Sequence, residues 1–434
     1  MIARHGGQIV LVAAAIPGEL VRARVERVSK GVIYARTVEV LQPSADRRTV
    51  QGDWLCGGNV YAHVAYSRQL EIKAAVIADA FARIARLPLP NLKTVTGSEE
   101  RGYRMRARLH ARNGRIGFYR EGTHDLCDPA VTGQLLPETL DVLDAVGRAL
   151  YRERIGGVLS LELAENMPGD QRAIHLEIAA PADLSRVPDH VGPGLTGLTY
   201  AGPFARVSAV VAGSPTVTDR VLVVSGDRER SMTLQRDVRA FFQGNRYLLP
   251  TLVSRVVSLV EPGPVVDLYA GVGLFGVALA ACGRRAIAAV EGDRVSAQDL
   301  KANAAPYGSA IEAMREDVET YLGRHAAVPD ATFVVDPPRT GMSREAATAI
   351  VGCRPRAIVY VSCDAATLAR DVRRLIDSGY VLEHIEGFDL FPNTAHVETV
   401  AKLRRTERDE AERGVGAPAS EELGGVQGSP SFTH

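Results

Sequence analysis

Apolar and polar residues alternate with a period of two over the first part of the chain, a pattern typical of half-buried β-strands. The alternating runs are Gln8–Ala13, Glu19–Val28 and Val32–Leu41, with turns expected at Pro17-Gly18 and Lys30-Gly31. Residues 1–45 are therefore predicted to form a small β-barrel. The first residues already lie within the pattern, so an opening strand is expected to be missing upstream.

The period changes to that of an amphipathic helix within residues 46–100. Apolar residues recur there at helical spacing, at Ile72, Ala75, Val76, Ala80 and Ile84. Proline cannot continue a helix, so we expect this one to end before Pro88 and Pro90.

A strand-rich region follows over residues 101–235, and its clearest element is Tyr103–Arg112. In this stretch Arg104, Arg106, Arg108, His110 and Arg112 alternate with apolar residues. The alternation predicts a strand with one cationic and one apolar face. The cationic face is either the solvated side of an antiparallel sheet or a strip that contacts phosphates. Residues 46–235 are predicted to form one central domain.

Strands and helices alternate from residue 236 to residue 404. The predicted strands are Val265–Tyr269, Ala286–Glu291, Thr332–Asp336 and Ala357–Ser362. Short apolar runs rich in β-branched residues and separated by helices are typical of a parallel, doubly wound sheet. We therefore predict a Rossmann-like α/β domain over residues 236–405. Residues 406–434 are rich in Glu and Arg and then in Gly, Ser and Pro, which predicts a disordered tail.

Composition and charge narrow the class of protein. A chain of 434 residues is too long for one compact core, so two or three domains are expected. The 51 basic and 51 acidic residues balance, which argues against a nucleic-acid packaging protein. Residues 101–120, however, hold seven arginines and no acid, so any nucleic-acid surface should be local. No apolar run is long enough for a membrane span, and the N-terminus lacks the apolar core of a signal peptide.

The five cysteines are Cys56, Cys127, Cys282, Cys353 and Cys363. They are sparse, odd in number and scattered, which argues against a disulfide framework and for the reducing cytoplasm. A cytoplasmic location is therefore expected.

A glycine-rich turn follows the first predicted strand of the α/β domain. The spacing of Gly271, Gly273 and Gly276 fits the dinucleotide fingerprint G-x-G-x-x-G, so an NAD(P)-dependent oxidoreductase has to be considered. Glu291, at the end of the next strand, can accept hydrogen bonds from a ribose in a dinucleotide or in S-adenosylmethionine. The turn alone does not decide between these cofactors.

Two acidic residues favour S-adenosylmethionine. Asp267, four residues before the first glycine, suits a cofactor with an ammonium and a sulfonium group and would repel a pyrophosphate. A later strand ends in Asp336-Pro337-Pro338-Arg339, at the carboxyl edge where doubly wound sheets bind ligands. We therefore expect S-adenosylmethionine as the cofactor.

Cys363 follows the next strand and is predicted to point into the same cleft. Carbon 5 of uracil is a poor nucleophile, but a thiolate that adds to carbon 6 turns the ring into an enolate that can attack a methyl group. A base must then remove the proton on carbon 5. Glu398 is the expected base and His396 the second candidate. The alternative for Glu398 is a purely structural role, as a carboxylate at the end of a strand that forms an ion pair.

Five stretches carry a resemblance to a known family. They are Phe241–Asn245, Asp267–Gly273, Asp336–Arg339, Val359–Asp371 and Phe391–Glu398. Together they resemble the RNA (uracil-5-)-methyltransferases, a class I family that modifies bacterial tRNA and 23S ribosomal RNA. The resemblance is strong over residues 236–404 and looser before them. It implies Cys363 as the nucleophile and Glu398 as the proton acceptor.

The resemblance, together with the residue patterns described above, indicates which residues are expected to bind cofactor and RNA. The expected cofactor-binding residues are Gln243, Tyr269, Glu291, Asp336, Asp267, Gly271, Gly273 and Asp317. The expected substrate-binding residues are Phe241, Phe242, Arg339, Arg104, Arg106 and Arg108. The two phenylalanines would stack on a base that is flipped out of the RNA. Leu274 stands where the family usually has Asn, which puts one polar cofactor contact in doubt.

The N-terminal segment resembles the TRAM domain, an RNA-binding barrel of the ribosomal branch, without its usual opening strand. Members of that branch often hold a [4Fe–4S] cluster on four cysteines. Of these places only Cys56 is kept; Val50 and Asn59 fill two others, and the fourth lies near Thr132, with Cys127 out of register. One or two thiols cannot hold such a cluster, so no iron–sulfur cluster and no other metal is predicted.

Three hypotheses remain, of which uridine methylation explains the most features. An oxidoreductase leaves Asp267 and the Asp336 motif unexplained, and a non-catalytic RNA-binding or assembly protein would not need both Cys363 and Glu398. The expected partner is RNA, with no membrane, and the chain is expected to act as a monomer. The TRAM-like segment favours 23S ribosomal RNA, whereas the missing cluster favours tRNA. We take ribosomal RNA as the first expectation and tRNA as the alternative.

Overall fold

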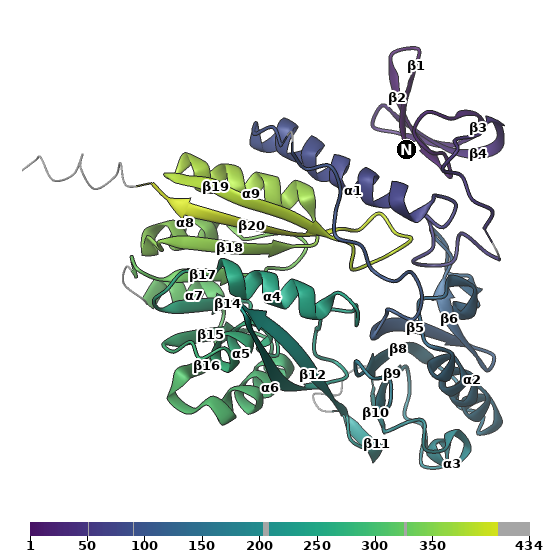
Figure 1. The fold of residues 1–434 in the computed structure, drawn as a ribbon. Coiled ribbons are helices and arrows are strands. Elements are labelled where there is room, and N and C mark those ends of the chain that lie inside the picture. The colour runs from purple at the N-terminus through teal and green to yellow at the C-terminus, as the bar shows by residue number, and fades with distance from the viewer. Residues whose placement is uncertain (51, 90, 203–207, 325–327, 407–434) are drawn as a thin grey trace, which may run out of the picture.

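The computed structural model describes residues 1–50, 52–89, 91–202, 208–324 and 328–406, so the predicted disordered tail lies outside the described residues except for its first residue. Three sheets and one long hairpin organise the chain (Figure 1). In that view the N-terminal sheet stands at the upper right, the central sheet lies below it, and the α/β sheet fills the left side. None of the described helices is long and apolar enough to cross a membrane.

The N-terminal sheet has four strands in the order β1-β2-β4-β3. Their bounds are β1 Ile2–His5, β2 Gln8–Ala13, β3 Leu20–Ser29 and β4 Val32–Gln42. The three predicted strands are confirmed to within a residue or two. Strand β1, which was not predicted, pairs antiparallel with β2. No pairing joins β1 to β3 within the part of the chain that the structure describes, so a closed barrel stays a prediction.

The predicted helix is confirmed as α1 (Tyr66–Ala80), which continues into a π-helical turn, η1 (Phe81–Ala85), and stops before Pro88. Its buried face contributes Ile77 to the core beneath the α/β sheet. Of the predicted apolar positions, Ile72 and Ala80 are buried, but Ala75, Val76 and Ile84 are exposed, so the face predicted from spacing is corrected. A segment predicted as part of the central domain thus packs on the α/β domain.

The central sheet has seven strands in the order β11-β10-β9-β8-β5-β6-β7. They are β5 Arg106–Arg112, β6 Arg115–Tyr119, β7 Leu126–Cys127, β8 Val158–Glu165, β9 Arg172–Ile178, β10 Gly197–Ala201 and β11 Ala209–Gly213. Its helices are η2 Pro129–Thr132, α2 Pro137–Arg152 and α3 Val187–Val191. The alternation predicted for β5 is confirmed, because Ala107 and Leu109 are buried against α2 while Arg108 is exposed. The strand begins at Arg106 rather than Tyr103.

Two cysteines predicted to be scattered thiols are joined in a disulfide, which corrects the expectation drawn from composition. The Cα atoms of Cys56 and Cys127 lie 5.6 Å apart although 71 residues separate them. The loop before α1 packs on the edge of the central sheet. There the backbones of Cys56 and Arg120 pair in an isolated antiparallel β-bridge, and the Gly57 amide donates a hydrogen bond to Tyr119 O (3.1 Å). This packing places Cys127 beside Cys56, and the neighbourhood of Thr132 also lies against the same loop, where Gln134 Nε2 donates to Gly57 O (2.9 Å).

The α/β sheet has the order β16-β15-β14-β17-β18-β20-β19, with β19 and β20 antiparallel to each other and β20 antiparallel to β18. Its strands are β14 Val265–Leu268, β15 Ile287–Glu291, β16 Ile311–Arg315, β17 Thr332–Val335, β18 Ala357–Ser362, β19 Tyr380–Phe388 and β20 Glu398–Arg405. The four predicted strands are confirmed, and β16, β19 and β20 are additional. The Rossmann-like fold class is thereby confirmed.

Helices cover both faces of this sheet, as its buried strands require. They are α4 Leu249–Leu259, α5 Leu274–Ala281, α6 Arg294–Ala304, η3 Ala305–Ala310, α7 Val318–Arg324, α8 Arg344–Cys353 and α9 Ala365–Asp377. One hydrophobic core lies on each face of the sheet, and alternate residues of β18 point into them. Val359 packs in the core with α4 and α5, and Tyr360 packs in the core with α8 and α9.

A long hairpin, β12 (Thr216–Ser225) and β13 (Arg228–Asp237), packs on the α4 face. Val221 and Leu234 from its two strands enter the core with α4 and α5. The hairpin belongs by packing to the α/β unit, although it precedes the boundary predicted at residue 235.

Candidate active site

The order of the α/β sheet reverses between β14 and β17, and ligands of such sheets bind at the carboxyl ends of the strands beside this reversal. The glycine-rich loop follows β14 there. Gly271 and Gly273 have positive φ angles of 57° and 96°, which other residues rarely adopt. A Cβ atom on Gly271 would meet nothing within 4 Å, whereas one on Gly273 would lie 2.8 Å from Leu300 Cδ1. The loop is thus tightly packed on one side and open on the other.

Glu291 lies at the end of β15 beside this loop. Its Oε2 accepts a hydrogen bond from the Gly271 amide (2.7 Å), and its Oε1 accepts one from the Asp293 amide (2.7 Å). These bonds fix the carboxylate at the cofactor edge. Asp317 follows β16 at the same edge, and its Oδ1 lies 2.9 Å from where a Cβ atom of Gly292 would be. Both acids thus lie where the sequence placed them.

Asp267 is fully buried beneath the loop. Its Oδ2 accepts a hydrogen bond from the Gly276 amide (2.8 Å), and burial raises the pKa of this carboxyl to about 8. Its Oδ1 has no hydrogen-bond partner among the described residues. The carboxyl is thus enclosed by protein atoms and bonded to the first turn of α5 beneath the glycine-rich loop.

Asp336 follows β17, and its amide donates to Leu268 O (3.3 Å), next to Tyr269. Gln243 Nε2 donates to Asp336 Oδ2 (3.3 Å). Burial raises the pKa of Asp336 above its usual value, and the bond from Gln243 opposes this. Three residues expected at the cofactor, Gln243, Tyr269 and Asp336, are therefore neighbours.

The pairing of β18 with β20 brings Cys363 and Glu398 together. Ser362 pairs with Thr399 in this antiparallel ladder, so the next position outward sets Cys363 against Glu398. Glu398 is buried, and its pairing with Phe388 on β19 fixes its backbone. Residues 35 positions apart in sequence thus meet at the edge that also holds Asp336.

The electrostatics of this pair suit proton transfer. Burial, and then Glu398, raise the pKa of the Cys363 thiol to about 11, while a hydrogen bond and the charge of Arg339 act in the opposite direction. Burial and the nearby Asp336 raise the pKa of Glu398 well above its usual value. The thiol and this carboxyl therefore both bind a proton more tightly than they would in water.

Arg339 is the cation at the centre of the site. Its guanidinium nitrogen Nη2 lies 3.1 Å from Nε2 and 3.2 Å from Nδ1 of His396, and its carbonyl accepts from Thr367 Oγ1 (3.2 Å). Burial and Arg339 lower the pKa of His396 to about 4, which makes the imidazole a weak base. This favours Glu398 over His396 as the proton acceptor.

The two phenylalanines expected to stack on a base lie in different environments. Phe241 is 60 % exposed, and the guanidinium carbon of Arg106 lies 5.8 Å from its ring centroid. Phe242 is 3 % exposed, and Arg236 lies over its ring at 4.5 Å. The prediction for Phe242 is corrected, because a ring packed in the core beneath an arginine has no face left for a base. Phe241 is the available aromatic ring.

The arginines of β5 are largely compensated by acids on neighbouring strands. Arg106 and Arg108 lie 3.3 and 3.7 Å from Glu162 on β8, and Arg108 also lies 3.1 Å from Glu177 on β9. Arg104 donates to Gln134 Oε1 (2.5 Å). These ion pairs agree with the first alternative, in which the cationic face is the solvated side of an antiparallel sheet. Phosphate contacts by the three arginines stay a prediction.

A buried charge cluster joins the central domain to the segment that carries Gln243. Glu165 on β8 pairs with Arg172 (2.7 Å) and with Arg246. Arg236 on β13 pairs with Asp219 (2.7 Å) and donates to Glu165 O (2.5 Å). Because buried charges need their partners, this cluster fixes how the two domains meet beside the active site.

The loop between β19 and β20 is held by residues that sequence analysis missed. Arg48 and Gln69 both donate to Asn393 Oδ1 (2.7 and 2.9 Å), and Lys73 on α1 pairs with Asp389 (2.5 Å) and donates to Phe391 O (3.0 Å). A signal was present, because a lysine and a glutamine interrupt the apolar face of α1. The sequence could not name their partners, more than 300 residues away.

Replacing Lys73 by methionine is expected to lower the free energy of unfolding by about 3–5 kcal/mol, because Asp389 would be left buried without its cation. The measurement is denaturant unfolding followed by circular dichroism. Arg83→Met is the matched control, since its partner Asp79 and Arg83 itself are both exposed. That change should cost no more than about 1 kcal/mol. Equal effects of the two substitutions would contradict the role given to Lys73.

Comparisons with known proteins agree with this site. Residues 215–406 match the family model described as tRNA (Uracil-5-)-methyltransferase. An uncharacterised RNA methyltransferase of Thermosynechococcus vestitus is 31 % identical over 93 % of this chain and 94 % of its own length. One of Thermotoga maritima is 30 % identical over 93 % of this chain and 95 % of its own.

A solved structure shares the fold across nearly the whole chain. It is the Pyrococcus abyssi tRNA (uracil-54, C5)-methyltransferase in complex with S-adenosyl-L-homocysteine, with a TM-score of 0.70 and 24 % identity. The similarity covers 91 % of this chain and 94 % of that one.

These matches exclude the oxidoreductase that the glycine spacing alone allowed. The curated relatives extend over the N-terminal and central regions as well as the α/β domain. The chain belongs to the family of RNA (uracil-5-)-methyltransferases, and it is an S-adenosylmethionine-dependent enzyme that methylates RNA.

Proposed function

We propose that this enzyme methylates carbon 5 of a uridine in RNA through a covalent bond between Cys363 and carbon 6 of the base. The observation that carries the proposal is the pairing of β18 with β20, which sets Cys363 against Glu398 beside Asp336. A nucleophile, a base and a cofactor edge thus meet in one place.

The first step is addition of the thiolate. The half-buried Cys363 releases its proton to solvent, and Sγ forms a bond to carbon 6 of uracil while the electrons of the carbon 5–carbon 6 double bond move onto the ring as an enolate. Arg339 supports this step, because its positive charge favours the thiolate over the thiol. Phe241, the exposed aromatic ring, supports the base by stacking once the nucleotide has left its helix.

The residues around the glycine loop fit S-adenosylmethionine. Glu291 is placed to accept from its ribose hydroxyls, and the open side of Gly271 leaves free space. Gln243, Tyr269, Asp336 and Asp317 line the same edge, and Asp267 supports the loop from beneath through its bond to Gly276. When bound, the cofactor supplies an electrophilic methyl group on a sulfonium. Leu274 offers no polar contact, so the cofactor is held without a side-chain bond from this position.

The last step restores the aromatic base. After carbon 5 has taken the methyl group it still carries its proton, and Glu398 as a carboxylate accepts that proton. The electron pair re-forms the carbon 5–carbon 6 double bond, the bond from carbon 6 to Sγ breaks, and the thiolate leaves. The raised pKa of Glu398 makes its carboxylate a stronger base than an exposed glutamate.

The proposal predicts that the rate at which Cys363 reacts with an alkylating agent rises with pH from neutrality toward pH 11. Below the pKa of Cys363, about 11, the thiolate fraction increases about tenfold for each pH unit. Replacing Arg339 by alanine removes the cation that lowers this pKa, so the rise should move to higher pH. The measurement is the rate at which iodoacetamide alkylates Cys363 in the free protein, read by peptide mass spectrometry. A rise that does not move, or that moves to lower pH, would contradict the role of Arg339.

The RNA substrate is proposed as 23S ribosomal RNA, with tRNA as the second candidate. The TRAM-like N-terminal segment supports the first. The second is supported by the family description and by the fold shared with a tRNA (uracil-54, C5)-methyltransferase over 91 % of this chain. Mass spectrometry of 5-methyluridine in each RNA of a deletion strain separates them, because only the true substrate loses the modification.

The residues at the place of the family's iron–sulfur cluster do not fit such a cluster. Cys56 and Cys127 are bonded to each other, and the described residues contain no group of three His, Cys, Asp or Glu that could hold a metal ion. We propose that the enzyme works without a cluster, as a monomer in the cytoplasm. The proposed location rests on the RNA substrate, because the Cys56–Cys127 bond removes the argument from scattered thiols. Anaerobic reconstitution with iron and sulfide should then add no absorbance near the visible charge-transfer bands of a cluster.

A further inference from the structure

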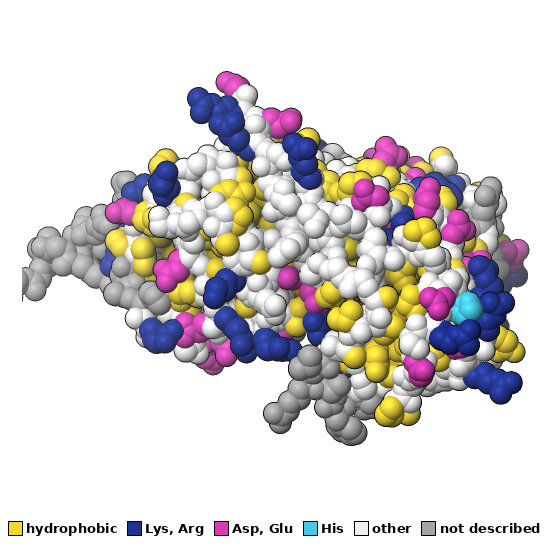
Figure 2. All heavy atoms as spheres, turned by 90° about the horizontal axis from the view of Figure 1, so that it is seen from below, with side chains coloured by type: hydrophobic (Ala, Val, Ile, Leu, Met, Phe, Trp, Pro, Cys, Tyr) yellow, Lys and Arg dark blue, Asp and Glu magenta, His cyan; other side chains and the backbone are white. Residues whose placement is uncertain are grey.

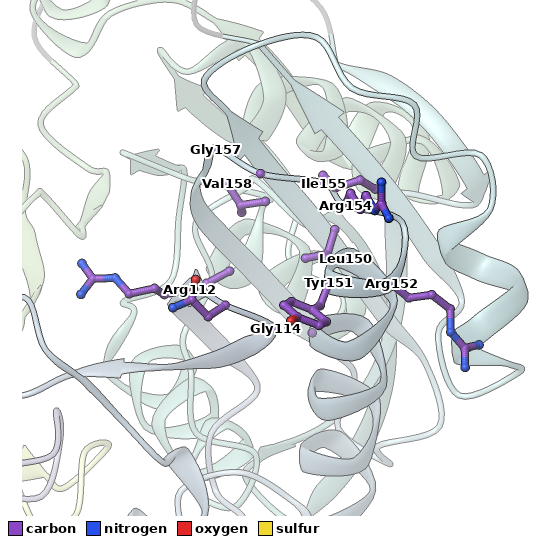
Figure 3. A pocket seen from close by; sticks show the side chains of 13 residues that line it. Arg112, Gly114, Leu150, Tyr151, Arg152, Arg154, Ile155, Gly157 and Val158 are labelled. Carbon is purple, nitrogen blue, oxygen red and sulfur yellow. The ribbon is translucent and has the colours of Figure 1, made fainter.

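The central domain contains a cavity of about 700 Å³ that the proposed reaction does not use (Figure 3). It lies where the turn between β5 and β6 meets the C-terminal end of α2 and the loop before β8. The lining residues used below are Arg112, Gly114, Gly147, Tyr151, Arg152 and Arg154. This volume is within the range of sites that bind small molecules or single nucleotides.

Two glycines bring α2 onto the turn and so shape the cavity. A Cβ atom on Gly147, in the middle of α2, would lie 2.4 Å from Gly114 O. A Cβ atom on Gly114, whose φ is +75°, would lie 2.9 Å from Tyr151 Cβ. Neither position has room for a side chain, so this close approach depends on glycine. It holds Tyr151 directly above the turn.

The ring of Tyr151 is 69 % exposed although it stands beside a cavity with an apolar floor. Leu150 is buried beneath it, and Val158 lies across the cavity. A large aromatic ring with one open face next to an apolar floor is the arrangement on which single-stranded nucleic acids stack their bases.

The rim of the cavity is positively charged. Its lining includes Arg112, Arg152 and Arg154 and no acidic residue. Within the described ranges, neither Arg112 nor Arg154 forms an ion pair, in contrast to Arg106 and Arg108 on the same sheet. Figure 3 shows the side chains of Arg112 and Arg152 pointing outward from the rim of the cavity in opposite directions. Figure 2 shows Lys and Arg side chains, with Asp and Glu side chains among them, at the end of the molecule where α2 and α3 lie.

We propose that this cavity binds a single-stranded segment of the RNA substrate, with one base stacked on Tyr151 and the flanking phosphates contacted by Arg112 and Arg154. The inference rests on the proposed RNA substrate. Cations on either side of an exposed ring match the chemistry of a nucleotide, whose flat base lies between two anionic phosphates.

The path from the cavity to the active site follows β5. At one end of this path, Tyr103 Oη donates to Pro392 O (3.4 Å) in the loop that leads to Glu398. At the other end lies Arg112. Eight residues of extended chain separate Arg104 from Arg112, which is about 26 Å. A base held at Tyr151 is therefore remote from the target uridine, and the cavity contributes to affinity and position rather than to chemistry.

The stacking contact is tested with fluorescein-labelled oligouridylate, whose binding to the full chain is followed by fluorescence anisotropy. Tyr151→Ala is expected to weaken binding about tenfold, the scale of one lost base stack. Tyr151→Phe keeps the ring and should bind like the wild-type enzyme. Because the ring is exposed, both variants should fold, and an unchanged thermal midpoint verifies this.

The phosphate contact is tested by the salt dependence of the same binding. For single strands, each lost phosphate contact lowers the slope of log K against log salt by about 0.7. Arg112→Ala should show this decrease, whereas Arg228→Ala, an exposed arginine at the end of the β12–β13 hairpin, should leave the slope unchanged.

The proposal is overturned if Tyr151→Ala binds oligouridylate as tightly as Tyr151→Phe, or if Arg112→Ala and Arg228→Ala have the same slope. Failure of the proposed function is a separate result. It would be seen as wild-type enzyme that binds RNA but forms no covalent complex with 5-fluorouridine RNA.

Discussion

Replacing Cys363 by alanine is expected to abolish both methylation and the covalent complex with RNA. Without the thiolate no bond forms to carbon 6, carbon 5 stays a poor nucleophile, and kcat/KM should fall by at least about 10⁴-fold. Cys363 is half-buried just beyond β18, and alanine is smaller, so the fold should be kept. The measurement is transfer of a radioactive methyl group from S-adenosylmethionine to RNA.

The covalent step is observed directly with 5-fluorouridine RNA. Fluorine replaces the proton that Glu398 would remove, so the adduct cannot resolve and should appear as a protein–RNA complex stable to denaturing electrophoresis. Wild-type enzyme should form it and Cys363→Ala should not. Cys282→Ala is the matched control, because that thiol is also partly exposed but lies at the end of α5, away from Glu398. A complex that survives in Cys363→Ala would refute the assigned nucleophile.

The sequence was sufficient for four of the seven strands of the α/β sheet, because the signals of these four are local. The runs ending at Leu268 and Ser362 are apolar and short, since both faces of a parallel strand are buried. The residues that follow such strands necessarily lie at one edge, so the proximity of Gly271, Asp336 and Cys363 could be inferred without knowing any contact.

Features that depend on tertiary packing could not be predicted in this way. The bond between Cys56 and Cys127 requires a loop to pack on the edge of the central sheet, and no local pattern records that contact. Phe241 and Phe242 are adjacent and identical, yet one is exposed and one is in the core. The alternation of β5 predicted a cationic face correctly but not the acids on β8 and β9 that compensate Arg106 and Arg108.

The support of the loop between β19 and β20 could not be predicted for the same reason. Lys73 lies on a helix that sequence assigned to the central domain, while its partner Asp389 precedes the last strand of the α/β sheet. Strand β20 was not predicted either, although its register is what sets Glu398 against Cys363. The sequence offered Cys363 and Glu398 as candidates, but it did not show the strand pairing that brings them together.

Replacing Glu398 by glutamine should separate the two halves of the reaction. The thiolate can still add and carbon 5 can still take the methyl group, but an amide cannot accept the carbon-5 proton. Turnover should fall about 10²–10⁴-fold, the contribution of a general base. Methylated RNA bound covalently to the enzyme should accumulate, which Cys363→Ala cannot produce. The raised pKa of Glu398 means that its neutral form is easily populated, so a neutral amide of the same shape should pack without loss.

His396→Ala is the decisive companion, because His396 is the other group near Arg339 that could act as base. Both variants are mixed with ordinary uridine RNA and S-adenosylmethionine, and the covalent complex is measured after denaturation. Accumulation in Glu398→Gln with normal turnover in His396→Ala is expected, since a pKa of about 4 leaves the imidazole a poor proton acceptor. The reverse pattern would assign the base to His396 and leave Glu398 a structural carboxylate at the end of β20.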